Sequence, residues 1–297
     1  MLPDAVMDAL RLQPGETAVD CTLGFAGHSR IMAARLGPAG RLVALDRDAD
    51  TLPRARELLA GLPARVSVVA SNFAALPKVL AAEGVASADA LLADLGMSSM
   101  QVDAPDRGFS YMRDGPLDMR MDRTRGKTAA EWLATVSADE LARVLSGYGD
   151  EPDAERIAAA LVSARQVNPL LRTGDVVRVI AALQPAAPVR RRPDGHKALH
   201  PAARTFQALR IAVNRELDAL SELLRVLPAV LSPGGRAAII SFHSGEDRLV
   251  KEAFAAGLRA GFYTEVCGDP VRAGPEEAAA NPRSRSAKLR WAVRARE

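Results

Sequence analysis

The chain has 297 residues, of which 48% are hydrophobic and 25% are charged, and its formal net charge is +3. This composition is typical of globular proteins, and the length suits one large domain or two modest ones. No apolar run reaches the roughly 18 residues that a membrane span needs, and residues 1–16 lack a signal-peptide pattern. Two cysteines, Cys21 and Cys267, are too few for a disulfide framework, so we expect a reducing cytosol and a cytoplasmic protein. Secreted, membrane-spanning and fibrous classes are excluded.

Apolar strands alternate with helical segments through the first third of the chain. The predicted strands are residues 17–23, 41–45, 66–70 and 88–95. Three helices are predicted between them: the first ends at Leu36, and the other two span residues 49–60 and 74–82. Four apolar strands that alternate with helices indicate a parallel sheet covered on both faces.

The alternation stops after Gly96, and only helix signals follow as far as Pro201. Two capping boxes, Thr128-x-x-Glu131 and Ser137-x-x-Glu140, open helices in this segment. A linker rich in Pro and Arg, residues 185–193, closes it. We therefore expect a helical domain inserted into the sheet domain. The first part of the sheet domain would be residues 1–102, the insertion residues 103–200, and the second part of the sheet domain residues 201–297, with the basic C-terminal tail.

The alternating pattern resumes in the last third of the chain. Apolar residues at helical spacing from Phe206 to Leu227 predict one long helix. Further strands are predicted at residues 236–242, 262–266 and 289–293, with a helix from about Gly245. The expected fold class is therefore α/β.

Positive charge gathers at the C-terminus. Residues 281–297 hold six basic side chains and one acidic one, and nearly all basic residues of the chain are arginines. An arginine-rich tail on a near-neutral body is typical of nucleic-acid binding, because the guanidinium group suits phosphate. Arginine-rich genomic coding explains the same composition, so both explanations stay open at this point.

Two glycines and an aspartate mark a nucleotide site. Gly24 and Gly27 follow the first strand and open a helix, where free backbone N–H groups point toward a ligand. Asp46 ends the second strand, where a carboxylate can accept the hydrogens of ribose hydroxyls. Ala26 stands where the dinucleotide fingerprint has its middle glycine, and packing alone also explains glycines in such a turn.

Two further residues lie at the same predicted sheet edge. Asp94 ends the fourth strand and is a candidate for holding an amine or hydroxyl, with capping of nearby backbone N–H groups as the alternative. His243 follows the fifth strand and is either functional or a structural histidine. Ser244 and Asp247 are predicted to cap the helix that follows.

No metal site is expected. His196 and His200 have the spacing of metal ligands on a helix, but Pro201 drives residue 200 out of the helical region. The sequence offers no third ligand nearby.

Several long strings resemble the MraW/RsmH family of S-adenosylmethionine-dependent methyltransferases, which modify N4 of a decoding-centre cytidine in 16S ribosomal RNA. The resemblance runs in the same order from near residue 1 to about residue 293. The strings that carry it are Asp94-Leu-Gly-Met-Ser-Ser-Met-Gln-Val-Asp103, the run from Arg107 to Met121, Tyr148-Gly-Asp-Glu151, the run from His200 to Asn214, Ser241-Phe-His-Ser-Gly-Glu-Asp-Arg-Leu-Val-Lys251 and Asn281-Pro-Arg-Ser-Arg-Ser-Ala-Lys-Leu-Arg290.

The resemblance implies a Rossmann-like methyltransferase sheet with an inserted helical domain, S-adenosylmethionine as cofactor and the small ribosomal subunit as substrate. In the cofactor site it implies ribose binding by Asp46 and adenine contact by Phe73. The other cofactor contacts that it implies are Ala26, Gly27, His28, Asp94 and Gln101.

This chain departs from the family pattern in four places. Phe25 and Ala26 stand where the family usually has Arg and Gly, and Gly245 replaces a usual Leu. A positive φ at Ala26 would strain the backbone by about 1 kcal/mol. The chain also begins after the family's N-terminal His-x-Pro segment, so we expect a truncated start.

Catalytic roles follow as hypotheses. Asp94 and the carbonyls of Leu95 or Gly96 are expected to accept the hydrogens of the cytosine amine, with His243 orienting the base or relaying a proton. For RNA binding, the stretch from Arg107 to Arg125 interleaves Phe109 and Tyr111 with arginines, and the aromatic residues alternatively form the core of the insertion.

Two rival functions and the oligomeric state stay open. A nicotinamide-dependent oxidoreductase shares the glycine turn and Asp46, and a non-catalytic ribosome-assembly factor shares the whole fold. The long amphipathic helix and the tail leave a homodimer open.

Overall fold

The computed structural model describes residues 1–183 and 200–296. The expected linker at 185–193 and His196 therefore lie outside the described residues. Within the described residues, no helix combines the length and the apolar composition needed to cross a membrane.

The chain forms two compact units, one made of Met1–Gly96 and Leu217–Glu297 and the other of Met97–Glu216. The second unit is the expected insertion, but it begins before residue 103 and ends after residue 200. Its extension has a physical reason, because Phe206 and Leu209 belong to the hydrophobic core of the inserted unit.

The first unit is built on one seven-stranded sheet in the order β3-β2-β1-β4-β5-β7-β6. The first five strands in this order are parallel, whereas β7 runs antiparallel to β5 and to β6. The order reverses between β1 and β4, which is where open parallel sheets bind their ligands. The strands are β1 (Thr17–Asp20), β2 (Arg41–Asp46), β3 (Arg65–Ala70), β4 (Ala88–Asp94), β5 (Leu231–Ser241), β6 (Tyr263–Val266) and β7 (Lys288–Arg294).

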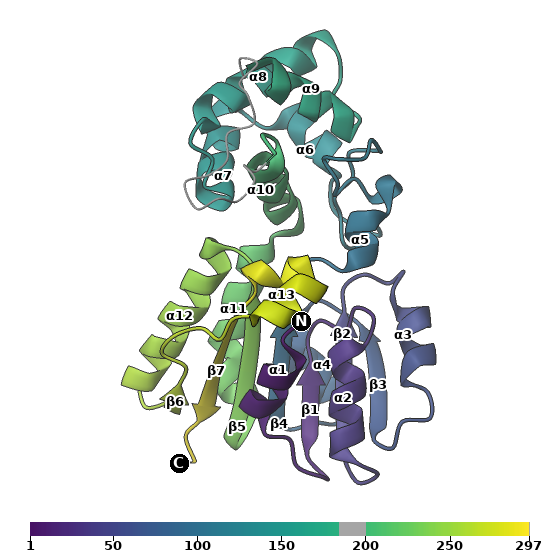
Figure 1. Cartoon of the computed structure of the whole chain (residues 1–297), viewed down its shortest axis with the longest axis vertical. Helices are drawn as coiled ribbons and strands as arrows, with labels where there is room; N and C mark the ends of the chain where they lie inside the picture. Colours follow the sequence, from purple (N-terminus) through teal and green to yellow (C-terminus); the bar gives the residue numbers. More distant parts are fainter. Residues whose placement is uncertain (184–199, 297) are drawn as a thin grey trace. The chain divides into compact units, whose positions relative to one another are not determined.

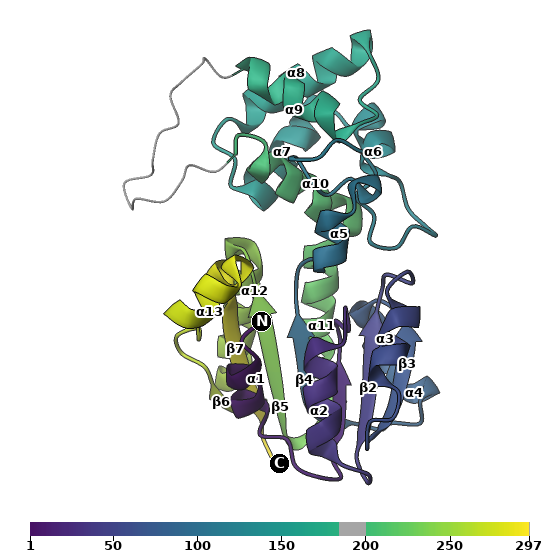
Figure 2. The ribbon, with the colours of Figure 1, turned by 45° about the vertical axis from the view of Figure 1, so that its right-hand side comes forward.

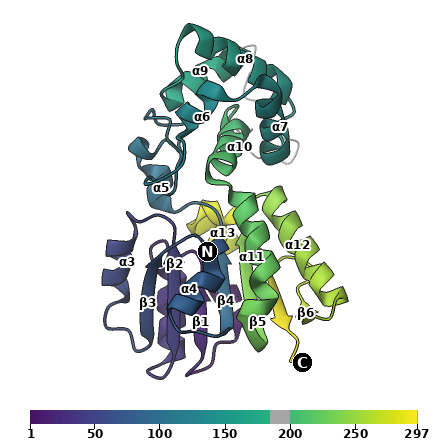
Figure 3. The same ribbon diagram turned by 180° about the vertical axis from the view of Figure 1, so that it is seen from behind.

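Helices cover both faces of this sheet. Figure 1 shows α1 and α2 in front of the strands, and the opposite view in Figure 3 brings α4 and α11 forward. The helices of this unit are α1 (Pro3–Leu10), α2 (Gly27–Leu36), α3 (Leu52–Leu59), α4 (Leu76–Ala82), α11 (Glu216–Val230), α12 (Ser244–Arg259) and α13 (Pro275–Ala280), with 3-10 turns η1 (Phe73–Ala75) and η3 (Pro282–Ser286).

Strict alternation along the central strands divides the apolar side chains between two cores. On β4, Leu91 and Ala93 point into one core with α4, α11 and α12, while Ala90 and Leu92 point into the other with α1, α2 and α3. All four side chains are fully buried. This two-sided burial is the reason that the strands read as continuous apolar runs, and it confirms the predicted parallel α/β sheet.

The inserted unit is helical, with a single core. Figure 2 shows helices α6 to α10 gathered together. Thr128 and Glu131 form the predicted capping box at the start of α6. The elements are α5 (Ser99–Asp103), η2 (Pro105–Arg107), α6 (Ala129–Thr135), α7 (Ala138–Gly149), α8 (Ala154–Val167), α9 (Thr173–Leu183) and α10 (Ala203–Asn214).

The single long helix predicted from Phe206 to Leu227 is wrong. Arg215 adopts φ 51° and separates α10 from α11. The apolar stripe serves two cores, since Phe206 packs in the inserted unit and Leu220 and Leu227 pack under the sheet.

Asn214 anchors the loop of the inserted unit that precedes α6. Its buried side chain accepts a hydrogen bond from the Met121 N–H (2.8 Å) and donates one to the Met119 carbonyl (2.6 Å). Met119 adopts φ 61°, a conformation unfavourable for a residue with a side chain. The amide of Asn214 therefore compensates for backbone strain in this loop.

We expect Asn214→Ala to lower the free energy of unfolding of the inserted unit by about 2–3 kcal/mol, because it leaves buried backbone groups without partners. Gln207→Ala on the same helix removes one bond from a partly exposed amide to the Tyr148 carbonyl and should cost less than about 1 kcal/mol. Urea denaturation of both variants measures the difference, and equal losses would contradict the anchoring role of Asn214.

Candidate active site

Three parallel strands of the first unit each end in an aspartate. Asp20, Asp46 and Asp94 are the last residues of β1, β2 and β4. These strands are neighbours in the sheet, so the three carboxyl groups share its carboxyl-terminal edge. They lie at the strand-order reversal, where a ligand is expected.

The turn after β1 presents backbone toward this edge. Gly24 adopts φ 47° and its N–H donates a hydrogen bond to Asp46 Oδ2 (2.8 Å). Ala26 is fully buried at φ 58°, so the left-handed backbone considered in the sequence analysis is present. A Cβ atom added at Gly27 would meet no atom within 4 Å, so the space beside the first turn of α2 is open.

Asp46 and Phe73 lie at the ends of neighbouring strands. The second carboxylate oxygen of Asp46 accepts a hydrogen bond from the Asp48 N–H (2.9 Å), and each oxygen keeps a further lone pair for a ligand. Burial raises the pKa of Asp46. Phe73 begins η1 just after β3, where the Asn72 side chain accepts a bond from the Ala74 N–H (2.9 Å). The structure therefore places both predicted cofactor residues at the same sheet edge.

Asp20 is a site residue that the sequence analysis missed. Its buried carboxylate accepts hydrogen bonds from the Ser29 hydroxyl (2.6 Å) and from the Thr22 N–H (3.0 Å). The Thr22 hydroxyl accepts a bond from the Asp94 N–H (2.6 Å), which links the turn to β4. Burial raises the pKa of Asp20. Asp20 carries the same signal as Asp46 and Asp94, an acidic residue that closes an apolar strand.

Asp94 is the least satisfied group of the site. Among the described residues, Oδ1 is buried without a hydrogen-bond partner, whereas Oδ2 lies 3.9 Å from the Met1 amine and 3.6 Å from His28 Nδ1. Burial raises the pKa of Asp94 to about 7; the Met1 amine opposes the shift, and Asp20 and Glu246 add to it. The alternative interpretation, a carboxylate that caps local N–H groups, is wrong for the described residues. A buried acceptor without a partner is instead suited to a ligand that donates hydrogen bonds.

His28 is held beside Asp94 as a neutral side chain. Its Nε2 lies 2.8 Å from the Met1 carbonyl and acts as the donor, which leaves Nδ1 unprotonated. Burial lowers the pKa of His28 to about 4, and the Met1 amine acts in the same direction. His28 therefore adds no positive charge to the site at neutral pH.

His243 begins α12 and caps it. Its Nδ1 accepts a hydrogen bond from the Glu246 N–H (3.4 Å), so the predicted capping by Ser244 and Asp247 is wrong. Nε2 lies 3.2 Å from Glu246 Oε1 without the geometry of a hydrogen bond. A Cβ atom at Gly245 would lie 3.2 Å from His243 Nδ1, so glycine leaves room for the folded-back ring. These contacts give His243 a structural role, and its catalytic role stays a prediction.

Asp247 forms ion pairs with β7 instead of the helix cap that the sequence predicts. It binds Lys288 (2.9 Å) and Arg290 (2.7 Å) of β7. Burial alone would raise the pKa of Asp247, but these two cations outweigh burial and keep the pKa below its ordinary value. The expected basic C-terminal tail is therefore wrong in part, because β7 is a strand inside the sheet and buries Arg290.

The remaining candidates lie in the inserted unit, in which Gln101 accepts a hydrogen bond from the Ser98 N–H (3.0 Å). Its contact with a cofactor stays a prediction. Phe109 is buried in the core, as one interpretation expected, whereas Tyr111 is only partly buried and stacks on His200 with 4.8 Å between ring centroids. Within the described residues, no group of three acidic, His or Cys side chains is placed to hold a metal ion.

Comparison with known proteins decides the family. The model of the MraW methylase family matches residues 1–295. The chain belongs to the MraW methylase family.

Relatives within the MraW methylase family cover almost the whole chain. Proteins called ribosomal RNA small subunit methyltransferase H are 46% identical in Geobacter sp. strain M21, 45% in Symbiobacterium thermophilum and 46% in Methylococcus capsulatus. These alignments cover 98%, 99% and 97% of this chain and 96%, 95% and 97% of the relatives. Among solved structures, TrmN from Thermus thermophilus matches with a TM-score of 0.46 and 15% identity, over 99% of this chain and 48% of that one.

The buried Asp94 of this MraW methylase predicts a pH dependence of stability. In the folded chain the Asp94 carboxyl group retains its proton up to about pH 7. In the unfolded chain it loses the proton near its ordinary pKa of 3.8. The free energy of unfolding should therefore fall as pH rises from about 4 to about 7. Asp94→Asn should remove this part of the decline, and Asp4→Asn, at an exposed position of α1, should keep it. Denaturant titrations at several pH values test this, and equal slopes for wild type and Asp94→Asn would contradict the raised pKa.

Proposed function

We propose that this MraW methylase transfers a methyl group from S-adenosylmethionine to the exocyclic N4 amine of a decoding-centre cytidine in 16S ribosomal RNA of the small subunit, in the cytoplasm. Membership of the family and the name shared by the relatives support a methyltransferase that acts on small-subunit ribosomal RNA. The observation that carries the choice of an amine is Asp94, a carboxyl group at the switch point with a buried oxygen that no described group satisfies.

The residues present fit S-adenosylmethionine. Asp46 would hold the ribose, Phe73 would contact the adenine, and the turn from Ala26 to His28 would border the methionine part. The open space beside Gly27 supports this assignment. The resemblance also assigns a cofactor contact to Gln101, which stays a prediction. When bound, the cofactor supplies a methyl group activated by a sulfonium centre.

The chain's own contribution is to orient the amine. The lone pair of an exocyclic cytosine nitrogen is delocalised into the ring, so hydrogen-bond acceptors on its two N–H groups favour the pyramidal, nucleophilic form. Asp94 Oδ1 would accept one N–H, and the carbonyl of Leu95 or Gly96 would accept the other. The Leu95 N–H is bonded to the Ile240 carbonyl (2.9 Å), which fixes this backbone at the strand end. His243 would orient the base through Nε2, since Nδ1 is used in the cap.

RNA binding would use both units. In the inserted unit, Met112 is 73% exposed beside Tyr111, and the guanidinium of Arg125 is largely exposed with a partner at 3.1 Å in Asp122. These side chains would stack against unpaired bases and contact phosphates. In the first unit, Arg283 and Arg285 on η3 would add phosphate contacts.

The decisive experiment is transfer of labelled methyl from S-adenosylmethionine to small subunits that lack the modification, followed by mapping of the nucleotide by mass spectrometry. We expect label on N4 of one decoding-centre cytidine. Label on another atom or RNA would overturn the assignment. Absence of label together with absence of S-adenosylhomocysteine binding would favour the assembly-factor rival, and binding of a nicotinamide cofactor would favour the oxidoreductase.

Asp94 is tested separately by Asp94→Asn. We expect turnover to fall about 100-fold or more, with S-adenosylhomocysteine binding retained, because the amide cannot replace an anionic acceptor. In the wild type, kcat/KM should rise with pH through about 7 as Asp94 ionises, and this rise should be absent from the variant. Near-normal turnover of Asp94→Asn would exclude the proposed role.

Arg283 and Arg285 are tested by reversing both charges to Glu. Each lost phosphate contact should lower the slope of log affinity for RNA against log salt by about 1. Arg225→Glu, at an exposed position of α11, serves as a matched control and should leave the slope unchanged. An unchanged slope in the double variant would remove η3 from the RNA-binding surface.

A further inference from the structure

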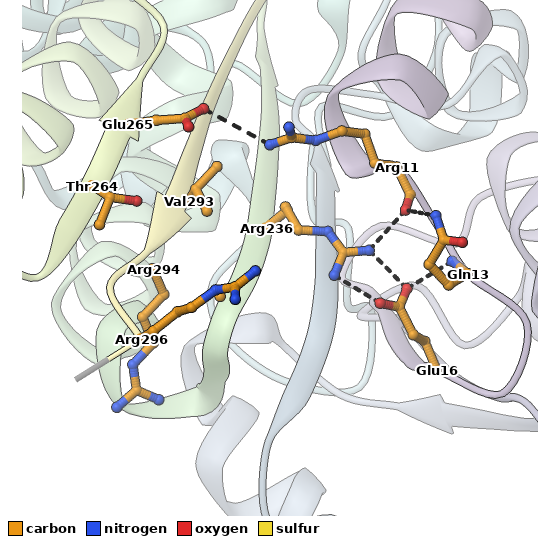
Figure 4. A pocket seen from close by; sticks show the side chains of 10 residues that line it. Arg11, Gln13, Glu16, Arg236, Thr264, Glu265, Val293, Arg294 and Arg296 are labelled. Atoms are coloured by element: carbon orange, nitrogen blue, oxygen red, sulfur yellow. Dashed lines mark hydrogen bonds and ion pairs between the residues drawn. The ribbon is translucent and has the colours of Figure 1, made fainter.

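A pocket of about 440 Å³ lies at the amino-terminal edge of the parallel strands, the opposite edge from Asp94. It is bordered by the end of α1, the starts of β1 and β5, and by β6 and β7 (Figure 4). The charged side chains that line it are Arg11, Glu16, Arg236, Glu265, Arg294 and Arg296. None of them takes part in the site described above.

One wall of the pocket is held in place by Arg236. Its guanidinium donates to both carboxylate oxygens of Glu16 (2.8 and 2.7 Å) and to the carbonyls of Leu10 (2.7 Å) and Arg11 (3.1 Å). Arg236 and Glu16 therefore neutralise each other, and they fix the loop between α1 and β1. This pre-organisation lowers the entropy cost of binding a ligand.

Arg11 faces the pocket from this loop and is held only weakly. It ends α1 at φ 47°, a left-handed conformation that costs about 1 kcal/mol for a residue other than glycine. Its guanidinium lies 3.9 Å from Glu265, and both side chains are more than half exposed. An exposed ion pair of this kind contributes little, so an anionic ligand can compete with Glu265 for Arg11.

Arg294 and Arg296 approach from the other side. Arg294 donates one bond to the Leu231 carbonyl and keeps further donors. Among the described residues, Arg296 makes no hydrogen bond or ion pair, and it is exposed. Gly234 adopts φ 76°, and a Cβ atom added there would lie in ordinary contact with Arg296 Nε (3.5 Å), so the Arg296 guanidinium lies beside this turn.

We propose that this pocket binds a phosphate-bearing ligand, with the phosphoryl group held by Arg11, Arg294 and Arg296. Arg236 and Glu16 neutralise each other, so the remaining charged side chains that line the pocket are these three arginines and Glu265. Guanidinium forks match the geometry of phosphate oxygens and bind them in bidentate fashion. The ligand is either a free phosphorylated small molecule or a phosphodiester of an RNA strand. The inference does not depend on the proposed methyl transfer, because the pocket lies at the other sheet edge.

The first test is calorimetric titration of the full chain with inorganic pyrophosphate. We expect saturable binding that is about tenfold weaker in Arg11→Ala/Arg296→Ala, because two charge-assisted contacts are lost. Glu265→Gln should bind more tightly than wild type, since it removes the competing carboxylate. Arg225→Ala removes an equal exposed charge outside the pocket and should bind like wild type. The Arg225→Ala control separates a local site from a diffuse charge effect, because a diffuse effect would weaken pyrophosphate binding in this variant as well.

The second test titrates a ten-residue oligouridylate into the same variants. Weaker binding by Arg11→Ala/Arg296→Ala identifies an RNA backbone as the source of the phosphate, whereas unchanged binding with weakened pyrophosphate identifies a free phosphorylated compound. Absence of saturable pyrophosphate binding at about 10 mM, or equal affinity of wild type and the double variant, would overturn the proposal. If thermal unfolding shows that the double variant is misfolded, Arg296→Ala alone and Glu265→Gln decide.

Discussion

The candidate site of the first unit depends on three carboxyl groups at the ends of adjacent strands, of which Asp20 is buried and Asp46 and Asp94 are partly buried. Asp20, Asp46 and Asp94 close β1, β2 and β4, and burial raises the pKa of each. Like charges in a region of low polarity are costly unless hydrogen-bond donors surround them. The turn after β1 supplies donors from the Gly24 and Thr22 N–H groups and the start of α2 adds the Ser29 hydroxyl, but neither supplies a donor to Asp94 Oδ1. Of the three carboxyl groups, Asp94 is therefore the one with a buried oxygen that no described hydrogen-bond donor satisfies.

The same constraint explains the backbone of the turn. Gly24 adopts a positive φ while its N–H donates to Asp46, and Ala26 accepts a left-handed conformation at the start of α2. The Ala26 N–H donates to the Leu23 carbonyl (2.7 Å), which closes the turn. The backbone of this turn therefore combines a donor for Asp46 with a small conformational strain at Ala26.

The two edges of the sheet have opposite electrostatic character. Acidic groups gather at the carboxyl-terminal edge, where an amine donor and a sulfonium cofactor are chemically suited. Arginines gather at the amino-terminal edge, around the pocket near Arg11 and Arg296. Both arrangements follow from strand direction, because parallel strands bring residues distant in sequence to one edge. In this chain, the polarity would allow one sheet to separate methyl transfer from the proposed binding of a phosphate.

The sequence by itself determined the alternation of strands and helices, the two-sided parallel sheet, the helical insertion and the positions of Asp46 and Asp94, because apolar periodicity and strand ends are local patterns. Tertiary structure decided what depends on contacts between distant residues. Asp20 acquires its role from Ser29 and Thr22, the helix predicted from 206 to 227 divides because its apolar stripe meets two cores, and His243 displaces Ser244 as a cap. The sequence predicts the strand at 289–293, but only the tertiary structure pairs Lys288 and Arg290 with Asp247. Side-chain partners and pKa shifts of this kind are set by packing, which no local pattern encodes.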